Sequence, residues 1–322
     1  MKAPGVFGIA CVLAGSLVLA ACGDSGPTTA ASTTSRPSLA SYTYDCRASA
    51  VTDPASATAA PGVTYTSMIV DSRYRDYRMF RPPTLNTNEP VPLVIVLHGT
   101  PIDAAGFEDV IHFQAEASAA GFMAVYPDGC DEDWDESDKS YDVDLLNKML
   151  DRLESQFQID TSRIYITGAS AGGFMAYRVA CDMASRIAAV ASIAGSMWWN
   201  DCVPARPIPI LEMHGTVDVN VPYDGGRSTY HNKLLPSVTS VIQQWVGLDG
   251  CTGNPVTSHG GITQISVWNR CKGGAVVQLD TIVGGHHTWF GSTFDPVPGE
   301  PDANTAVWSF LKQFRLPPVA TA

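Results

Sequence analysis

The chain has 322 residues, of which 45% are hydrophobic and 16% are charged, and its formal net charge is −12. This acidic balance argues against binding to nucleic acid or to anionic lipid surfaces, because both require clustered Lys or Arg side chains. The length suits one α/β domain with short additional segments and is too small for two large domains.

The N-terminal segment has the pattern of an export signal. Lys2 precedes an apolar run from Val6 to Ala21, which is shorter than the ~20 residues of a membrane-spanning helix. Small residues end the run before Cys22, and this resembles the lipobox of bacterial lipoprotein precursors. We therefore expect residues 1–21 to be a lipoprotein signal peptide and Cys22 to become the lipidated N-terminus. Ordinary secretion and an uncleaved anchor are the alternatives.

Residues 22–45 are rich in Ser, Thr, Ala, Pro and Gly and contain few bulky apolar side chains. Such a segment cannot bury enough surface to offset the entropy of ordering, so we expect a flexible tether. Residues 46–322 then form the folded domain. The expected location is the outer face of the cell membrane, where the acyl chains anchor the exported protein without inserting it, or from which part of it is released.

The segment from Asp128 to Asp144 contains nine acidic residues and one basic residue, Lys139. We interpret it as a solvated acidic loop. The alternative is a calcium site, but Asp133, Asp135 and Asp138 lack the glycine and terminal glutamate of an EF-hand loop. We therefore predict no metal and no cofactor.

Of the eight cysteines, six follow the signal and the lipidated Cys22. None of the six forms a CxxC pair, so three disulfides in an oxidising compartment fit better than a zinc site. Cys251 and Cys271 flank a short segment and are the expected pair, whose closure stabilises the fold by ~3 kcal/mol in the chain-entropy description. The pairing among the other four stays open: Cys46, Cys130, Cys181 and Cys202.

Apolar runs of strand length alternate with helical patterns along the chain. The runs cover residues 92–97, 122–126, 163–167, 188–194, 208–213 and 275–283, and the clearest helices cover residues 141–157 and 303–314. A further helix begins after the capping residue Asp103 and ends near Gly121. This alternation predicts a mostly parallel sheet with helices on both faces, and ligands at the carboxyl ends of the strands. A hairpin of residues 66–71 and 74–80 is expected at an antiparallel edge.

A GxSxG motif, Gly168-Ala169-Ser170-Ala171-Gly172, lies between the expected strand at 163–167 and a helical pattern. In this context a serine occupies a sharp, strained turn where only small neighbours fit. The turn also places Ser170 at a helix N-terminus, where backbone N–H groups favour a developing negative charge. Ser170 is therefore the predicted nucleophile.

An acid and a base follow in the order that such a nucleophile requires. Asp218 lies just beyond the strand at 208–213, and Asp224 is its nearest rival. His286 and His287 follow the strand at 275–283, and adjacent histidines point in different directions, so only one is the base. We favour His287, which makes Ser170, Asp218 and His287 the predicted catalytic triad.

An oxyanion hole needs two converging N–H donors. One is expected from Ala171, directly after the nucleophile, and the other from Thr100, which follows the strand end Leu97-His98-Gly99. His98 and His214 also follow strands, and we interpret both as structural.

These motifs together resemble a branch of the α/β-hydrolases, the polyhydroxybutyrate depolymerase-like and feruloyl or acetylxylan esterase-like secreted enzymes. The resemblance covers residues 66–314 and includes a Leu-His-Gly strand end, a GxSxGG elbow, an HGTxDxxVPY segment at residues 214–223 and a GHxWPG-like segment at residues 286–291. Matching Trp289 to the tryptophan of the family assigns the base to His287 and puts His286 where glycine is usual. The cysteine pattern of the family also supports the pairing of Cys251 with Cys271.

The resemblance implies an α/β-hydrolase fold without a large lid domain, and a serine esterase that acts on polyhydroxyalkanoate-type, feruloyl or acetyl-polysaccharide, or short acyl esters. We expect the site to be open and lined by Trp134, Trp198, Trp289 and His286. The expected partners are the ester substrate and, through the lipid alone, the membrane. The alternatives are a serine peptidase or acyltransferase on the same fold, and a lipoprotein that binds an envelope component without catalysis.

Overall fold

The computed structural model describes residues 57–58, 61–86, 88–229 and 232–318 of the chain. The predicted signal peptide (residues 1–21) and tether (residues 22–45), with Cys22, lie outside these ranges, as does Cys46. Within these ranges, no helix has both the length and the apolar character that a bilayer-crossing segment needs.

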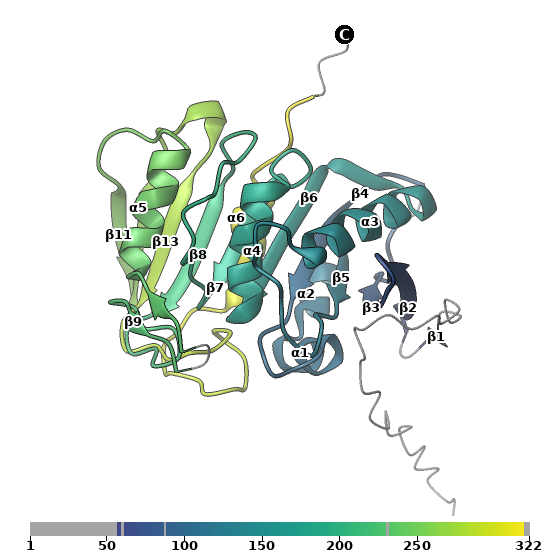
Figure 1. Cartoon of the computed structure of the whole chain (residues 1–322), viewed down its shortest axis with the longest axis horizontal. Helices are drawn as coiled ribbons and strands as arrows, with labels where there is room; N and C mark the ends of the chain where they lie inside the picture. The colour runs from purple at the N-terminus through teal and green to yellow at the C-terminus, as the bar shows by residue number, and fades with distance from the viewer. Residues whose placement is uncertain (1–56, 59–60, 87, 230–231, 319–322) are drawn as a thin grey trace, which may run out of the picture. The chain divides into compact units, whose positions relative to one another are not determined.

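The described residues form an eleven-stranded sheet in the order β1-β2-β3-β5-β4-β6-β7-β8-β13-β12-β11 (Figure 1). Its central strands are parallel, as predicted. In sheet order they are Met123–Pro127 (β5), Val91–Leu97 (β4), Ile159–Ala169 (β6), Ala189–Ile193 (β7), Ile210–Gly215 (β8) and Val277–Ile282 (β13). Because these strands run in one direction, the loops that follow them meet at one edge of the sheet.

Antiparallel strands flank this parallel centre on both sides. The predicted hairpin is present as Val63–Val70 (β2) and Arg73–Phe80 (β3), and the short strand Ala57–Thr58 (β1) pairs outside β2. On the other side, Val256–Gly260 (β11) and Thr263–Trp268 (β12) form a hairpin that the sequence pattern does not predict. Every residue of β11 is exposed, so this strand lacks the apolar run that identifies a buried one.

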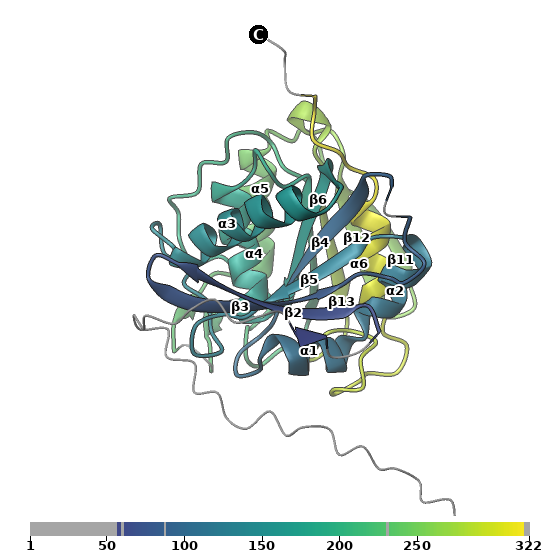
Figure 2. The same cartoon turned by 90° about the vertical axis from the view of Figure 1, so that its right-hand side faces the viewer.

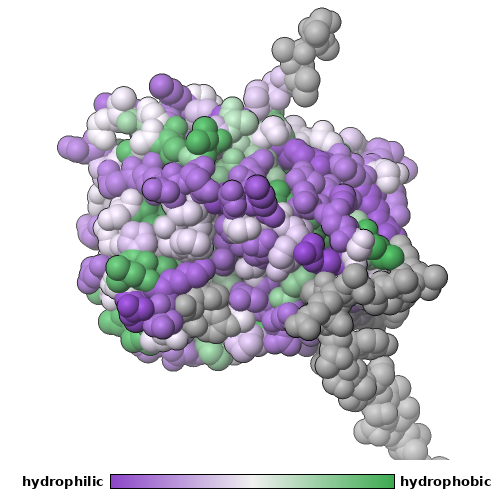
Figure 3. Space-filling view, viewed as in Figure 1, coloured by the Kyte–Doolittle hydropathy of each residue, from purple (hydrophilic) through white to green (hydrophobic). Residues whose placement is uncertain are grey.

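Helices cover both faces of the sheet (Figure 1; Figure 2). Tyr141–Gln156 (α3), Ala171–Asp182 (α4) and Val238–Leu248 (α5) pack on one face, whereas Ala104–Ile111 (α1), Phe113–Ala120 (α2) and Ala303–Leu311 (α6) pack on the other. Outward from α3, α4 and α5 the surface is mostly hydrophilic, with small separate apolar patches (Figure 3). The predicted α/β architecture is thus confirmed, and no lid domain occurs among the described residues.

The helix predicted from Asp103 to Gly121 is in fact two helices. Asp103 caps the first, accepting a hydrogen bond from the Gly106 N–H at 2.7 Å. At His112 the backbone adopts a left-handed conformation with φ of 51°, which ends α1 and begins α2. The sequence carries no glycine or proline at this position, so the break has no signal that periodicity would detect.

The structure contains the expected disulfide between Cys251 and Cys271. A second disulfide joins Cys181, in the last turn of α4, to Cys202 in the loop after β7. Cys130 is also disulfide-bonded. The bond between Cys181 and Cys202 ties the loop after β7 to the last turn of helix α4.

Helix α4 approaches strand β4 so closely that only glycine fits at two positions between them. A Cβ atom on Gly172 would lie 2.3 Å from the Leu97 carbonyl oxygen and 2.5 Å from that of His98. A Cβ atom on Gly168 would lie 2.5 Å from the Gly172 carbonyl oxygen. The two glycines of the GxSxG motif are therefore required by packing of backbone against backbone.

We predict that Gly172→Ala lowers the free energy of unfolding by about 2 to 3 kcal/mol, because the added methyl group collides with backbone that cannot move aside. Gly247→Ala is the matched control, since Gly247 also lies in a helix but has no atom within 4 Å of the added Cβ. The control should be neutral or stabilising by up to about 1 kcal/mol through helix propensity. Urea denaturation measures both, and equal effects of the two substitutions would contradict the packing argument.

Candidate active site

Ser170 lies in the turn between β6 and α4, and its backbone is strained. Its φ of 55° and ψ of −121° are unusual for a residue with a side chain. Two hydrogen bonds fix the turn: the Ser170 N–H donates to the Ile193 carbonyl at 2.9 Å, and the Ser170 carbonyl accepts from the Phe174 N–H at 3.0 Å. The strained turn places a half-buried hydroxyl at the carboxyl edge of the sheet.

His287 lies in the loop after β13 and bridges two side chains. Its Nε2 atom is 2.8 Å from Ser170 Oγ, and its Nδ1 atom is 2.7 Å from Asp218 Oδ2. An ionised carboxylate only accepts hydrogen bonds, so Nδ1 carries a proton and Nε2 of the neutral ring accepts from the serine hydroxyl. The structure thus brings the three predicted triad residues into one chain of hydrogen bonds.

Asp218 is buried and its carboxylate is held by backbone as well as by histidine. Its Oδ1 atom accepts from the N–H groups of Asn220 and Val221, both at 2.8 Å. Burial raises the pKa of this carboxyl, but hydrogen bonds from His214 and His287 outweigh that effect and hold the pKa of Asp218 well below its usual range. Asp218 is therefore a carboxylate at any pH near neutrality. Asp224, the rival acid, is exposed.

The two predicted oxyanion donors flank the serine. A Cβ atom on Gly99 would lie 3.2 Å from Ser170 Cβ, so the loop that carries Thr100 runs directly against the serine. Elsewhere in the described chain, no backbone carbonyl accepts a hydrogen bond from the N–H of Thr100 or of Ala171. Within the described chain, no backbone carbonyl therefore competes with a substrate oxygen for these two N–H groups.

Hydrogen bonds of two buried side chains, His98 and Trp134, fix the loop after β4. His98 is buried, donates from Nδ1 to the Gly99 carbonyl and accepts at Nε2 from the Gly129 N–H, each at 2.9 Å. Burial lowers the pKa of His98 to about 4, so its ring is neutral and structural. The Trp134 indole donates to the His98 carbonyl at 2.9 Å and packs on the His98 ring. The expectation that Trp134 binds substrate is corrected, since its ring is buried against this loop.

The acidic segment at 128–144 is not simply a solvated loop, as the sequence suggested. Asp133 accepts a hydrogen bond from the Thr100 hydroxyl at 2.8 Å, and Asp128 accepts from the Ala104 N–H at 2.7 Å. Asp142 is buried and pairs with Arg75 at 2.5 Å. The acidic side chains thus hold the oxyanion loop and the start of α1 in place. Three-ligand clusters suitable for a metal ion are absent from the residues described here.

The other predicted substrate-binding residues differ in their accessibility. Trp289 is buried between Phe107 and Phe113, and its indole donates to Asn304 Oδ1 at 2.9 Å. It belongs to the core, so the prediction that Trp289 contacts the substrate is wrong. Trp198 is 43% exposed in the loop after β7. His286 is exposed and directs Nδ1 to Asp295 Oδ2 at 2.9 Å.

Three side chains near the site were not predicted from the sequence. The Lys233 ammonium lies 4.0 Å from the centre of the exposed Trp198 ring and 3.8 Å from the buried Glu136 carboxylate. Glu212 contacts His214, which in turn approaches Asp218. Lys233 and Glu136 had no motif to identify them, whereas the position of Glu212 two residues before His214 on one strand places both side chains on the same face.

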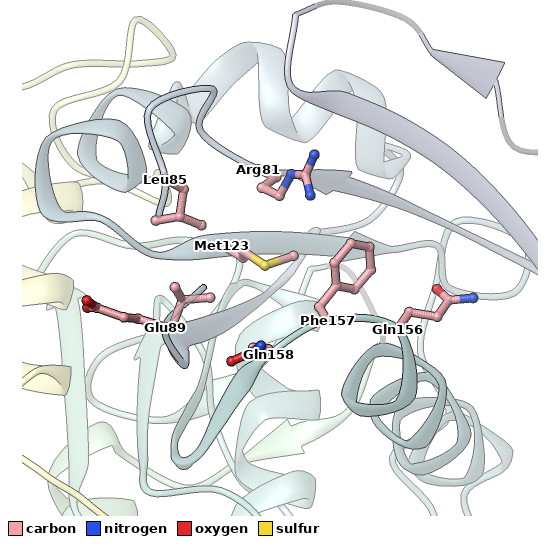
Figure 4. A pocket seen from close by; sticks show the side chains of 8 residues that line it. Arg81, Leu85, Glu89, Met123, Gln156, Phe157 and Gln158 are labelled. Atoms are coloured by element: carbon pink, nitrogen blue, oxygen red, sulfur yellow. The ribbon is translucent and has the colours of Figure 1, made fainter. Parts of the chain in front are cut away.

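A surface hollow of about 290 Å³ lies at the other end of the sheet (Figure 4). Arg81, Val91, Met123 and Phe157 are among the residues that line it. Val91 begins strand β4 and Leu97 ends it beside the serine turn, so the hollow is about 20 Å from Ser170 at the usual rise of a strand. It is not part of the candidate site.

Comparison with known proteins places these features in a family. Residues 72–232 match the family described as "Putative esterase", a range that includes Ser170 and Asp218 and ends before His287. The chain is 30% identical to "Putative esterase NocK" of Nocardia uniformis subsp. tsuyamanensis over 259 residues, which cover 72% of this chain and 75% of that protein.

Two further proteins are similar over part of their length or in fold. Feruloyl esterase B of Piromyces equi is 34% identical over 184 residues, 55% of this chain, but the match spans only 32% of that longer protein. The acetyl xylan esterase from Aspergillus awamori has the same fold, with a TM-score of 0.57 and 14% identity over 77% of this chain and 98% of that structure. Because the family match covers half of the chain and the Nocardia relative is similar over most of both chains, this chain belongs to the esterase family.

Proposed function

We propose that this protein is a serine hydrolase of carboxylic esters, with Ser170 as nucleophile, His287 as general base and Asp218 as the residue that orients the base. The observation that carries the proposal is the position of the His287 ring, 2.8 Å from Ser170 Oγ and 2.7 Å from Asp218 Oδ2. A single imidazole in this position takes a proton from the hydroxyl while the carboxylate fixes its tautomer.

In the first half of the proposed reaction, Ser170 Oγ attacks the ester carbonyl carbon as its proton passes to His287 Nε2. The N–H groups of Ala171 and Thr100 donate to the oxygen that becomes negative. The bond to the alcohol then breaks, and the proton on His287 passes to the departing alcohol oxygen. Ser170 is left as an acyl ester.

In the second half, water replaces the alcohol. His287 Nε2 takes a proton from the water as its oxygen attacks the acyl carbon, and the carboxylic acid leaves when that proton returns to Ser170 Oγ. Asp218 stays ionised throughout and stabilises the imidazolium that forms in each half. The low pKa of Asp218 suits this role, because the carboxylate does not compete for the proton.

For the substrate, we propose acyl esters of polysaccharides, such as feruloyl or acetyl esters, with polyhydroxyalkanoate-type and short acyl esters as the other members of the class. Feruloyl esterase B and a bifunctional acetylxylan esterase/xylanase are among the relatives in sequence. The exposed Trp198 ring lies in the loop after β7, next to Trp199 and with Lys233 over one face, and offers an apolar surface for the acyl group.

We further propose that the enzyme acts outside the cell, anchored by a lipid on Cys22 after removal of residues 1–21 and linked to its domain by residues 22–45. The disulfides of the domain are compatible with this location, because they persist in oxidising compartments.

The triad assignment predicts that Ser170→Ala and His287→Ala each reduce the hydrolysis of nitrophenyl acetate by about 10⁴-fold or more. His286→Ala is the matched control and should retain most of the activity, since His286 faces Asp295. Initial rates and labelling by a fluorophosphonate probe measure these effects. Labelling that survives Ser170→Ala points to another nucleophile, and a wild-type chain that is not labelled indicates a non-catalytic protein. Faster cleavage of peptide amides than of esters favours a peptidase.

The proposed substrate surface predicts that Trp198→Ala raises KM for a feruloyl ester roughly five- to tenfold, the loss of an apolar contact of about 1 to 1.5 kcal/mol. The effect on nitrophenyl acetate should be small, because its acyl group is too short to cover the indole. Val256→Ala removes an even more exposed apolar side chain, on edge strand β11, and should change neither KM. An unchanged feruloyl KM in Trp198→Ala would exclude this surface.

Lipid anchoring predicts that Cys22→Ser transfers the protein from the membrane fraction to the soluble fraction and abolishes incorporation of a labelled fatty acid. Cys11→Ser changes a cysteine within the signal and serves as the control, with anchoring expected to persist. Detergent phase partition of intact cells expressing each variant provides the measurement. Membrane retention of Cys22→Ser without fatty acid label would indicate an uncleaved anchor instead.

A further inference from the structure

His214 is a second histidine beside Asp218, and it is completely buried near the end of β8. Its Nε2 atom lies 2.9 Å from the Val221 carbonyl oxygen and 3.3 Å from Asp218 Oδ2. Its Nδ1 atom lies 2.7 Å from Glu212 Oε1. Both ring nitrogens therefore face oxygen atoms, and nothing in the proposed reaction uses this histidine directly.

The neighbours of the ring indicate its protonation state. A carbonyl oxygen only accepts hydrogen bonds, so Nε2 carries a proton. Glu212 accepts two further hydrogen bonds, from the Tyr177 hydroxyl at 2.9 Å and from the Gly195 N–H at 3.2 Å, which suits an ionised carboxylate. Burial raises the pKa of Glu212, whereas its hydrogen bonds with His214 and Tyr177 act in the opposite direction, and with the carboxylate ionised the second ring proton lies on Nδ1. Burial lowers the pKa of His214, but hydrogen bonds to Asp218 and Glu212 outweigh burial and raise that pKa to about 10.

The remaining groups around His214 do not oppose this charge. Tyr223 packs its ring edge-on to the imidazole with centroids 6.0 Å apart, and its hydroxyl is hydrogen-bonded to Thr281 of β13. Asp280, also on β13, is in register with Met213, so its side chain points to the opposite face of the sheet from His214. The ionisable groups on the His214 side are therefore Glu212, Asp218 and the two tyrosines at 177 and 223, with His287 on the other side of the Asp218 carboxylate.

The effect on Asp218 is to fix its carboxylate from two directions. Oδ1 is held by the N–H groups of Asn220 and Val221, while Oδ2 lies between the rings of His214 and His287. Val221 takes part twice, because its N–H donates to Asp218 and its carbonyl accepts from His214. The turn that carries Asp218 is thus tied to strand β8 through the His214 ring.

We propose that His214, held by Glu212, is a positioning residue that fixes the Asp218 carboxylate in the orientation in which it accepts from His287. The inference rests on the proposed function, since it assigns a supporting role within the same triad. His214 touches neither the substrate nor the reacting atoms. Its positive charge also makes Asp218 a weaker acceptor, which keeps the proton on His287 available for transfer.

The test compares His214→Ala and His214→Gln with the wild-type chain in the hydrolysis of nitrophenyl acetate. Turnover is expressed per site labelled to completion by a fluorophosphonate, so that unfolded protein is not counted. We expect His214→Ala to lower kcat about 100-fold with KM changed less than threefold, the size of effect that a small displacement of a catalytic group produces. His214→Gln should recover part of the loss, because its amide still donates a hydrogen bond but carries no charge.

The pH profile separates positioning from general loss of stability. Without the positive charge, Asp218 holds the proton on His287 more strongly, so the acid limb of kcat/KM for His214→Gln should move upward by about one pH unit. An acid limb and a kcat equal to those of wild type would overturn the inference. So would a loss in kcat without any movement of the acid limb, which is the result that simple destabilisation gives.

A measurement on the wild-type chain needs no variant to fold. With ¹⁵N-labelled histidine, one of the seven histidines should have both ring nitrogens protonated at pH 8, when ordinary histidines are neutral. Seven neutral rings at that pH would contradict the charged state of His214. If Ser170→Ala and His287→Ala leave ester hydrolysis intact, the proposed function is wrong. If they abolish hydrolysis, but the kinetics of the His214 variants and the ¹⁵N measurement are both negative, only the role of His214 is wrong.

Discussion

The carboxylate of Asp218 is the charge on which the geometry of the site depends. A buried carboxylate is costly unless hydrogen bonds replace its water, and here two backbone N–H groups and two histidines do so. These donors come from the turn after β8, from the strand itself and from the loop after β13. The orientation of His287 therefore depends on the parallel pairing of β8 with β13, which brings both loops to one edge.

The serine is held by a different constraint, which is steric. Ser170 adopts a strained backbone conformation that persists because helix α4 and strand β4 pack against each other without intervening side chains. The same close packing brings Gly99 against Ser170 and sets the distance between the nucleophile and the loop of Thr100. Electrostatics thus fixes the base, whereas backbone packing fixes the nucleophile.

Much of this arrangement could be predicted from the sequence, and the rest could not for identifiable reasons. Buried parallel strands have continuous apolar runs, and the turn that carries Ser170 admits only small residues on either side of the serine. The sheet and Ser170 could therefore be predicted from the sequence. The exposed edge strand β11, with its hairpin to β12, and the break at His112 have no such pattern. Trp134 was misassigned because an aromatic residue in an acidic segment gives no indication of whether it faces solvent or the protein interior.

The loop after β7 combines exposure with rigidity, which bears on how the site selects substrates. Trp198 faces solvent, yet the loop is tied to α4 by the Cys181–Cys202 disulfide and by Arg178, which packs on Trp199 and pairs with Asp201 at 2.9 Å. The exposed indole is thus carried by a loop that is anchored to the same helix that begins directly after Ser170. An apolar surface fixed in this way binds without first becoming ordered, so less of its interaction energy is lost to conformational entropy.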